Sequence, residues 1–125
     1  MAKSTGLGLM DASMIFDNLQ PDILVVVGDR FEMMSVTLAA AYMNIIIVHT
    51  MGGEVTGTID ESIRHAITKF AQIHFPANED SRQRIIKMGE DPEFVFNVGC
   101  PRTDLVADEL KNDSYQVLNS IFKIF

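Results

Sequence analysis

The stretch that decides the fold is residues 45–75, IIIVHTMGGEVTGTIDESIRHAITKFAQIHF. It opens on an apolar run, Ile45 to Val48, and passes through a glycine-rich loop. It then takes helical spacing from Asp60 to Ala71 and ends on a second short run, Ile73 to Phe75. Short runs rich in branched residues predict strands, and apolar residues three or four positions apart predict a helix. This order predicts a right-handed βαβ unit with parallel strands.

The same alternation of short apolar runs and helical spacing continues on both sides of this unit. Pro21 precedes another strand, Asn78 can cap a further helix, and Gly89 stands where that helix should end. The prediction is an α/β fold, with a Rossmann-like parallel sheet in three layers, covered by helices on both faces. The added strands are Ile23 to Val27 and Phe94 to Val98, and the added helices are Met10 to Leu19, Phe31 to Met43 and Glu79 to Met88.

Composition narrows the class of protein. A chain of 125 residues suits one domain, and a net charge of -7 disfavours nucleic acid and anionic membranes as partners. The one cysteine, Cys100, excludes an internal disulfide framework and favours a reducing compartment. No run approaches the ~20 apolar residues of a membrane span, and the first residues lack the apolar core of a signal peptide. We therefore expect a cytoplasmic protein.

The unusual residues fall on loops that leave strand ends. Ligands of open parallel sheets bind beyond the carboxyl ends of the strands. Three loops leave such ends in this prediction, residues 28–30, 49–54 and 99–102, and they carry the glycines and charges that a core does not need. The sequence therefore predicts a binding site at this edge of the sheet.

Two of these loops have both a structural and a functional interpretation. Asp29 can cap the helix that follows it, or it can serve a reaction. Gly52 and Gly53 have no Cβ, so the backbone there can approach a ligand closely. They do not form a P-loop, because no Gly-Lys-Ser/Thr follows them.

The helix that begins near Asp60 leaves alternatives open. Thr58 and Glu61 have the spacing of a capping box, and Asp60 suits the positive end of the helix dipole. Asp60 with Arg64, and Glu61 with His65, are four residues apart and could pair along the helix. Alternatively, Arg64 and His65 point into the cleft and contact a phosphate or a sugar.

The remaining reactive side chains point to core packing. His49 follows a buried strand and His74 lies inside one, so both are interpreted as core histidines. Together with Cys100 they lack a compact zinc-binding spacing, and no motif supplies a base for this cysteine. No metal site and no cofactor are predicted.

Three segments carry a resemblance to a known family. GDRFE at residues 28–32, GGEVTGTIDESIRHAITK at 52–69 and VGCPRTD at 98–104 resemble the hydrolysing UDP-N-acetylglucosamine 2-epimerases of sialic acid biosynthesis. These include bacterial enzymes and the epimerase half of the animal bifunctional epimerase/kinase. Residues 111–120 are also similar to the animal type.

The resemblance implies a two-domain, glycosyltransferase-B-type fold of which residues 1–125 form one partial Rossmann-like domain. The chain is similar to the latter part of the first domain, so the opening strands and the whole second domain are absent from it. We therefore expect an uncovered sheet edge and apolar face, and association with copies of itself or with a full-length homologue. The isolated chain should bind UDP weakly or not at all.

The resemblance also implies a reaction on a UDP-sugar substrate, with no metal or cofactor. UDP leaves C1 as the C2 proton is removed, and water adds to the 2-acetamidoglucal to release N-acetylmannosamine. Asp29 and Asp60 match family carboxylates. A third family carboxylate lies three residues before Glu54, where this chain has Met51, so either Glu54 or Glu61 substitutes or catalysis is impaired. The candidate substrate contacts are Arg30, Gly52, Gly53, Arg64 and His65.

Two other functions compete with the enzyme. One is a non-catalytic remnant or interaction module that retains the fold. The other is a flavodoxin-like signalling or nucleotide-binding domain. Against the latter, Asp29 has no acidic pair and switch lysine of the receiver type, and the chain has no glycine-rich dinucleotide loop.

Overall fold

The structure, a computed structural model, describes residues 1–111. The similarity noted for residues 111–120 therefore lies outside the described residues, apart from Lys111. None of the helices in residues 1–111 has the length and apolar character needed to cross a membrane. The elements are α1 (Ala2–Leu19), β1 (Ile23–Val27), α2 (Phe31–Tyr42), β2 (Ile46–Thr50), α3 (Ile59–Phe70), β3 (Ile73–Phe75), α4 (Glu79–Lys87), a 3-10 turn (Pro92–Phe94) and α5 (Pro101–Lys111).

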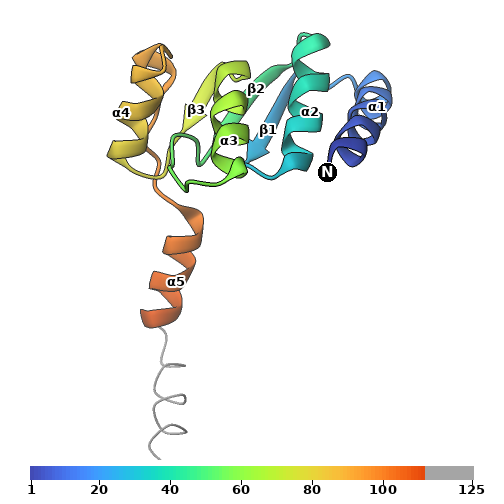
Figure 1. The fold of residues 1–125 in the computed structure, drawn as a ribbon. Coiled ribbons are helices and arrows are strands. Elements are labelled where there is room, and N and C mark those ends of the chain that lie inside the picture. The colour runs from blue at the N-terminus through green and yellow to red at the C-terminus, as the bar shows by residue number, and fades with distance from the viewer. Residues whose placement is uncertain (112–125) are drawn as a thin grey trace, which may run out of the picture.

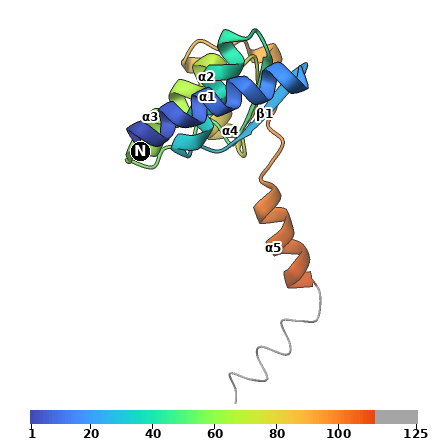
Figure 2. The same ribbon diagram turned by 90° about the vertical axis from the view of Figure 1, so that its right-hand side faces the viewer.

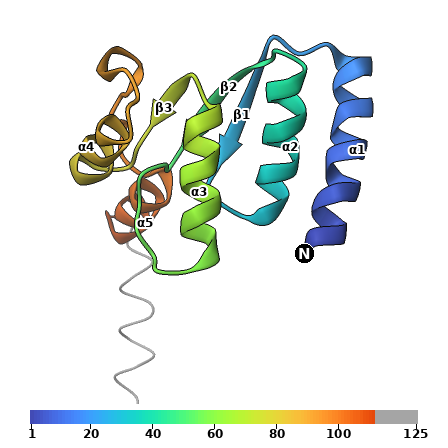
Figure 3. The same ribbon diagram turned by 45° about the horizontal axis from the view of Figure 1, so that its top comes forward.

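The strands form a parallel sheet in the order β1-β2-β3. The register pairs Val25 with Val48, and His49 with His74. Helices α2 and α3 make the crossovers between strands, and they lie with α1 on one side of the sheet (Figures 1 and 3). The α/β, Rossmann-like prediction is therefore confirmed. Figure 2 shows α5 leading away from this body.

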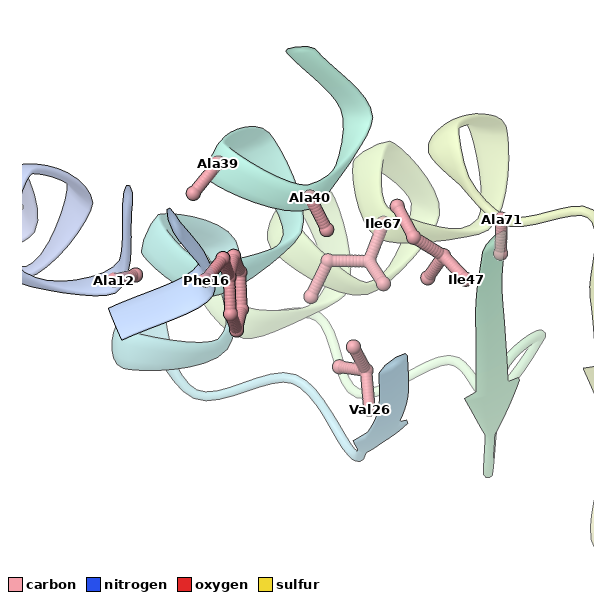
Figure 4. Close-up of a cluster of buried hydrophobic side chains, with 8 residues drawn as sticks. All are labelled: Ala12, Phe16, Val26, Ala39, Ala40, Ile47, Ile67 and Ala71. Carbon is pink, nitrogen blue, oxygen red and sulfur yellow. The ribbon is translucent and has the colours of Figure 1, made fainter. Parts of the chain in front are cut away.

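The core lies between the sheet and these three helices. Alanines of α2 bring its backbone close to the strands, and α1 packs closely on α2. A Cβ on Gly8 would stand 3.1 Å from Ser35 Oγ, and that hydroxyl donates to the Thr5 carbonyl oxygen at 3.0 Å. The buried cluster consists of Ala12, Phe16, Val26, Ala39, Ala40, Ile47, Ile67 and Ala71 (Figure 4).

The second face of the sheet lacks a covering layer within residues 1–111. The register places alternate residues of the strands on this open face. Val25 is 58% exposed and Val27 is 59% exposed, whereas Val26, on the helix side, is buried. The predicted coverage of both faces is thus not seen in the described part of the chain, and the expected uncovered apolar face is present.

Several boundaries depart from the predictions. Helix α1 begins at Ala2 rather than Met10, because its packing against α2 retains the glycine-containing first turns. The predicted strand Phe94 to Val98 is wrong at its start, because Phe94 ends the 3-10 turn instead. Pro92 begins this turn, and the Asp91 carboxylate caps it by accepting from Glu93 N at 3.0 Å. The rest of the predicted strand runs beside β3, with Phe96 N donating to His74 O at 2.9 Å. Helix α5 was not predicted.

The helix ends predicted at Asn78 and Gly89 are confirmed. Asn78 Oδ1 accepts from Ser81 N at 2.8 Å and caps α4. Gly89 follows the last turn of that helix with a φ of 99°. Both residues act through local geometry, which is why the sequence located them.

Candidate functional site at the carboxyl ends of the strands

Each loop of the predicted edge turns at a residue with positive φ. Gly28 has a φ of 75°, Met51 of 60° and Gly99 of 83°. Met51 is the exception among them, because side chains other than glycine, asparagine and aspartate rarely adopt this conformation. The loops enclose an open, largely apolar hollow of about 440 Å³, lined by Val27, Thr50, Met51, Phe75, Val98, Gly99, Pro101 and Arg102. The predicted meeting of these loops at one edge is confirmed.

Asp29 and Arg64 form the central ion pair of this edge. Arg64 Nη2 contacts Asp29 Oδ2, and Arg64 Nη1 donates to the Glu54 carbonyl oxygen at 2.7 Å. The Arg64 side chain is 6% exposed and that of Asp29 is 22% exposed. One guanidinium therefore connects the loops after β1 and β2 from beneath. Of the alternatives left open by the sequence, the pairing of Asp60 with Arg64 and the capping role of Asp29 are contradicted, because Arg64 and Asp29 bind each other across two elements.

Gly52 and Gly53 pack against the protein itself. A Cβ on Gly52 would stand 3.0 Å from His49 Nδ1, and one on Gly53 would stand 2.4 Å from the Ser81 carbonyl oxygen. Gly53 also has a φ of 79°, and its carbonyl oxygen accepts from Arg84 Nη1. The absence of Cβ atoms lets this loop sit tightly on the sheet and on α4. Contact of these glycines with a substrate stays a prediction.

Glu61 holds the loop that leads into α3. Its Oε2 accepts from Thr56 N at 2.8 Å and from Gly57 N at 2.7 Å, and these bonds hold the pKa of the carboxyl below its usual value. The capping box between Thr58 and Glu61 is therefore wrong, because Glu61 binds Thr56 and Gly57 instead. Thr58 is nevertheless the N-cap residue of α3. The predicted pair of Glu61 with His65 is confirmed, with Oε1 and Nε2 3.7 Å apart.

Arg30 and Asp60 lie on the solvent side of the edge. Arg30 donates to both carboxylate oxygens of Glu32, from Nη2 at 2.8 Å and from Nε at 3.2 Å. Asp60 is exposed at the start of α3, where it receives a long hydrogen bond of 3.5 Å from Thr58 Oγ1. The hydrogen bond to Glu32, then the charge of Glu32 and lastly that of Asp60 raise the pKa of Arg30, so this guanidinium and the Asp60 carboxylate share one surface.

Both histidines of the strands are core residues, as predicted. His49 is fully buried, with Nε2 3.0 Å from the Gly28 carbonyl oxygen and Nδ1 3.3 Å from Thr68 Oγ1. Burial lowers the pKa of His49 to about 4. Burial likewise lowers the pKa of His74, and Glu90, 3.4 Å away, opposes this. His49 therefore supports the Gly28 turn from inside as a neutral ring.

Cys100 caps the start of α5 beside the hollow. Its carbonyl oxygen accepts from Thr103 N at 2.9 Å, and hydrogen bonds from Thr103 and then Arg102 lower the pKa of the thiol. The negative charge of the Glu54 carboxylate opposes this by raising the pKa of the thiol. The loop after β2, which carries Glu54, and the loop of residues 99–102 before α5 are therefore close enough for their charged groups to interact.

The fold thus brings most of the predicted residues to one edge. Asp29, Arg64 and the Glu54 backbone form one cluster, Glu61 and His65 a second, and Arg30 and Asp60 a third. Sequence reasoning missed Arg84 and Thr68, which fix the Gly53 carbonyl and the His49 ring. No local signal indicated them, because their partners lie far along the chain.

Comparison with known proteins agrees with this α/β fold and its loop-built edge. The family model described as UDP-N-acetylglucosamine 2-epimerase matches residues 1–123. The chain belongs to this family. This membership corrects the alternative of a flavodoxin-like signalling domain.

The sequence relatives include epimerases with more than one kind of sugar in their names. A hydrolysing UDP-N,N'-diacetylbacillosamine 2-epimerase of Legionella pneumophila is 43% identical over 95% of this chain and 31% of its own length. A UDP-N-acetylglucosamine 2-epimerase of Neisseria meningitidis is 37% identical over 76% of the chain and 25% of its length. The chain therefore spans about a third or less of the length of these relatives.

Solved structures of family members share the fold. The UDP-GlcNAc 2-epimerase of Methanocaldococcus jannaschii matches with a TM-score of 0.82 at 22% identity, over 96% of this chain and 36% of that one. The enzyme of Neisseria meningitidis bound to UDP-GlcNAc matches with a TM-score of 0.81 at 21% identity, over 93% and 33% of the two chains. The likeness covers the described sheet and its helices, which are Rossmann-like.

Proposed function

We propose that this chain contributes the carboxylate-bearing edge of a hydrolysing UDP-N-acetylglucosamine 2-epimerase, which forms N-acetylmannosamine and UDP for sialic acid biosynthesis in the cytoplasm. The observation that carries the proposal is the cluster in which Arg64 joins Asp29 to the Glu54 loop at the carboxyl ends of β1 and β2. Ligands of parallel sheets bind at such an edge, and sugar chemistry of this kind needs carboxylates there.

The proposed reaction begins with elimination. The C1–O bond breaks and its electron pair leaves with UDP. The electron pair of the C2–H bond becomes the second bond between C1 and C2, and the proton passes to a carboxylate. Water then adds its hydroxyl to C1, and C2 regains a proton on the opposite face. Departure of UDP runs ahead of proton removal and builds positive charge on the ring. Asp29 and Asp60 stabilise this charge and move the protons.

The geometry suggests distinct roles for the basic residues. Arg64 is 6% exposed and both of its terminal nitrogens are engaged, so we assign it to holding Asp29 in place. Arg30 is 76% exposed and His65 is 28% exposed, so these side chains are accessible to a phosphate or a sugar hydroxyl. Glu61 is held by two backbone N–H groups, which leaves Glu54 as the better substitute for the missing carboxylate.

Met51 favours a second candidate, a member of the family that has lost catalysis. It lies at the hollow where a carboxylate of the family pattern would stand, and a thioether neither takes up a proton at neutral pH nor balances a cation. If that group stabilises the transition state, its loss should slow turnover by about 10²–10³.

The two candidates separate in a chimera in which residues 1–111 replace the matching part of the Legionella relative. Release of UDP and N-acetylmannosamine from UDP-N-acetylglucosamine, and of UDP from the diacetylbacillosamine nucleotide, gives the rate. We expect a slow enzyme that Met51→Glu accelerates, and we expect Asp29→Asn to abolish the gain. Activity unchanged by Met51→Glu but lost in Glu54→Gln would assign the role to Glu54. No activity in any variant would favour the non-catalytic candidate.

A further inference from the structure

A closed ring of contacts runs through the protein beside the Asp29 carboxylate. Asp29 contacts Arg64 of α3, and Thr68 lies one turn further along that helix. Thr68 Oγ1 is 3.3 Å from Nδ1 of His49 in β2, and His49 Nε2 is 3.0 Å from the Gly28 carbonyl oxygen. Gly28 precedes Asp29 in the chain, which closes the ring. The loop after β1, the strand β2 and the helix α3 therefore meet at one set of polar groups.

The partners of His49 determine which nitrogen of its ring carries the hydrogen. The Gly28 carbonyl oxygen can only accept, so Nε2 donates to it and carries the hydrogen. Burial lowers the pKa of His49 to about 4, so the ring is neutral at neutral pH and Nδ1 is left as an acceptor. The hydroxyl of Thr68 faces this nitrogen. It pairs an acceptor that burial would otherwise leave unsatisfied, which is unfavourable.

Thr68 has a second acceptor close by. Its hydroxyl is also 3.0 Å from the Arg64 carbonyl oxygen, to which it can donate. That oxygen lies inside α3, where the helix backbone supplies an N–H as well. The single hydroxyl hydrogen is therefore needed more at Nδ1 of His49. Through these two contacts Thr68 connects the His49 ring to the turn of α3 that carries Arg64.

Gly52 covers this pair of side chains from the loop after β2. A Cβ on Gly52 would stand 3.0 Å from His49 Nδ1 and 3.3 Å from Thr68 Oγ1. His49 and Thr68 are both 0% exposed, and Gly52 is buried as well. The missing side chain lets the backbone close over the hydrogen bond and keep out water, which would otherwise compete for both groups. This assigns Gly52 a role inside the protein.

We propose that His49 and Thr68 are positioning residues for the Asp29 carboxylate. With its hydrogen on Nε2, His49 holds the turn in which Gly28 has a φ of 75°, and Asp29 follows directly. Arg64 holds the carboxylate from the other side of the ring. Loss of the Thr68 hydroxyl frees the His49 ring and with it the turn, although the ion pair remains. The importance of this position for a reaction rests on the proposed function, whereas the ring of contacts exists without it.

Nitrogen NMR spectra and amide exchange of the full 125-residue chain test the ring without any reaction. At neutral pH, the spectrum of His49 should show the hydrogen on Nε2 and a hydrogen-bonded Nδ1. Thr68→Val keeps the shape of the side chain but removes the donor, so Nδ1 should take the chemical shift of an unpaired nitrogen. The Gly28 amide, which donates to Thr50 O, should exchange about three- to tenfold faster relative to that of Ile47. Thr68→Ser should restore both.

Thr37→Val is the matched control. Thr37 is as fully buried as Thr68, but its hydroxyl has no hydrogen-bond partner within residues 1–111. The same substitution there should leave the His49 spectrum unchanged. The exchange of the Gly28 amide relative to that of Ile47 should also stay the same, because this ratio separates local opening of the turn from a general loss of stability.

Gly52→Ala reaches the same hydrogen bond from the covering loop. Its Cβ should push the His49 ring away from Thr68, so we expect the spectrum and the exchange ratio of Thr68→Val. Gly8→Ala is the control for crowding. It brings a Cβ within 3.1 Å of Ser35 Oγ, between α1 and α2, and should leave the His49 spectrum as in the wild type.

A His49 ring with its hydrogen on Nδ1 overturns the proposal, and so does an unchanged exchange ratio in Thr68→Val. In the Legionella chimera, Thr68→Val should lower kcat about three- to tenfold with KM unchanged, and Thr68→Ser should recover the rate. A raised KM with unchanged kcat overturns the role in positioning Asp29. An unsubstituted chimera without turnover contradicts the proposed function alone, because the spectra and the exchange ratio still decide the positioning role.

Discussion

On the helix side of the sheet, β1 and β2 place Val26, Ile47 and His49 beneath α2 and α3, and all three are buried. On the open side, the same strands present Val25 and Ile46, which are about half exposed. The buried side is thus the more polar one, since it holds two histidines with hydrogen-bonding partners. The covering layer accounts for the burial of Val26 and Ile47, whereas Val48, on the open side of the central strand, is buried between β1 and β3. Polarity alone does not determine burial.

The largest effect should come from unpairing the charge beneath the edge. Asp29→Asn leaves the Arg64 guanidinium buried without its carboxylate, and we expect a loss of roughly 3–5 kcal/mol in the free energy of unfolding, measured in urea. Glu32→Gln is the matched control. Glu32 also pairs with an arginine, but on the exposed surface, and its change should have little effect. Equal losses in the two variants would contradict the distinction between them.

Ile46 and Ile47 are adjacent in β2 and lie on opposite faces of the sheet, so their substitution compares the stability that each face contributes. Ile47 is fully buried on the helix side, and Ile47→Ala should cost about 2–5 kcal/mol of unfolding free energy. Ile46 is 45% exposed on the open side, and Ile46→Ala should cost less than about 1 kcal/mol. Urea titration of both variants decides. A loss in Ile46→Ala as large as that in Ile47→Ala would mean that the open face is covered in solution.

The buried histidines should make stability depend on pH. The folded pKa of His49, about 4, lies below the unfolded value of about 6.5, so the unfolded chain binds more protons between these values. Stability is therefore full above pH 6.5 and declines as the pH falls towards 4, by about 3 kcal/mol from His49 alone. His74 acts in the same direction. The free energy of unfolding, measured between pH 7 and 5, should decline less in His49→Gln than in the wild type.

The smallest expected effect on stability comes from Met51, in the loop after β2. Met51 holds a φ of 60°, which is unfavourable for a residue with a Cβ. Met51→Gly should therefore raise the free energy of unfolding by about 1 kcal/mol, and with it the melting temperature. Asn44 has a similar φ of 56° and serves as the control. Asn44→Gly should gain less, because asparagine tolerates this conformation. A loss of stability in Met51→Gly would show that the thioether contributes more by packing in the hollow than the backbone strain takes away.

Much of the fold was predictable because its signals are local. The strands Ile23 to Val27 and Ile73 to Phe75 were found with their observed bounds, since branched runs bounded by turns specify extended backbone. The cap at Asn78 was found for the same reason. The 3-10 turn at Pro92 and the early start of α1 were missed. The turn was missed because Phe94 to Val95 read as part of an apolar strand, whereas Pro92 starts a turn there. The early start of α1 was missed because it depends on the close approach of Gly8 to Ser35 of α2.

The candidate site divides in the same way. The parallel connections predicted between the strands placed the loops of Asp29, Glu54 and Cys100 at one edge before any contact was known. The partners of the individual side chains were predicted less well. Arg64 was expected to pair with Asp60 on its own helix or with a ligand, and it instead binds Asp29 and the Glu54 carbonyl oxygen on other loops. Glu61 was expected to cap with Thr58, and it instead accepts from the N–H groups of Thr56 and Gly57, just before Thr58.

The sequence by itself determined the parallel direction of the strands β1 to β3, the helical period of α2, α3 and α4 and the edge at which the charged residues gather, because these depend on neighbours a few positions apart. Only the tertiary structure decided which carboxylate Arg64 binds, which face of the sheet is covered and that Leu7, Met10 and Met14 of α1 stay exposed. Side chains choose partners by distance in space, and residues such as Asp29 and Arg64, or Gly53 and Arg84, become neighbours only after the helices have packed on the sheet.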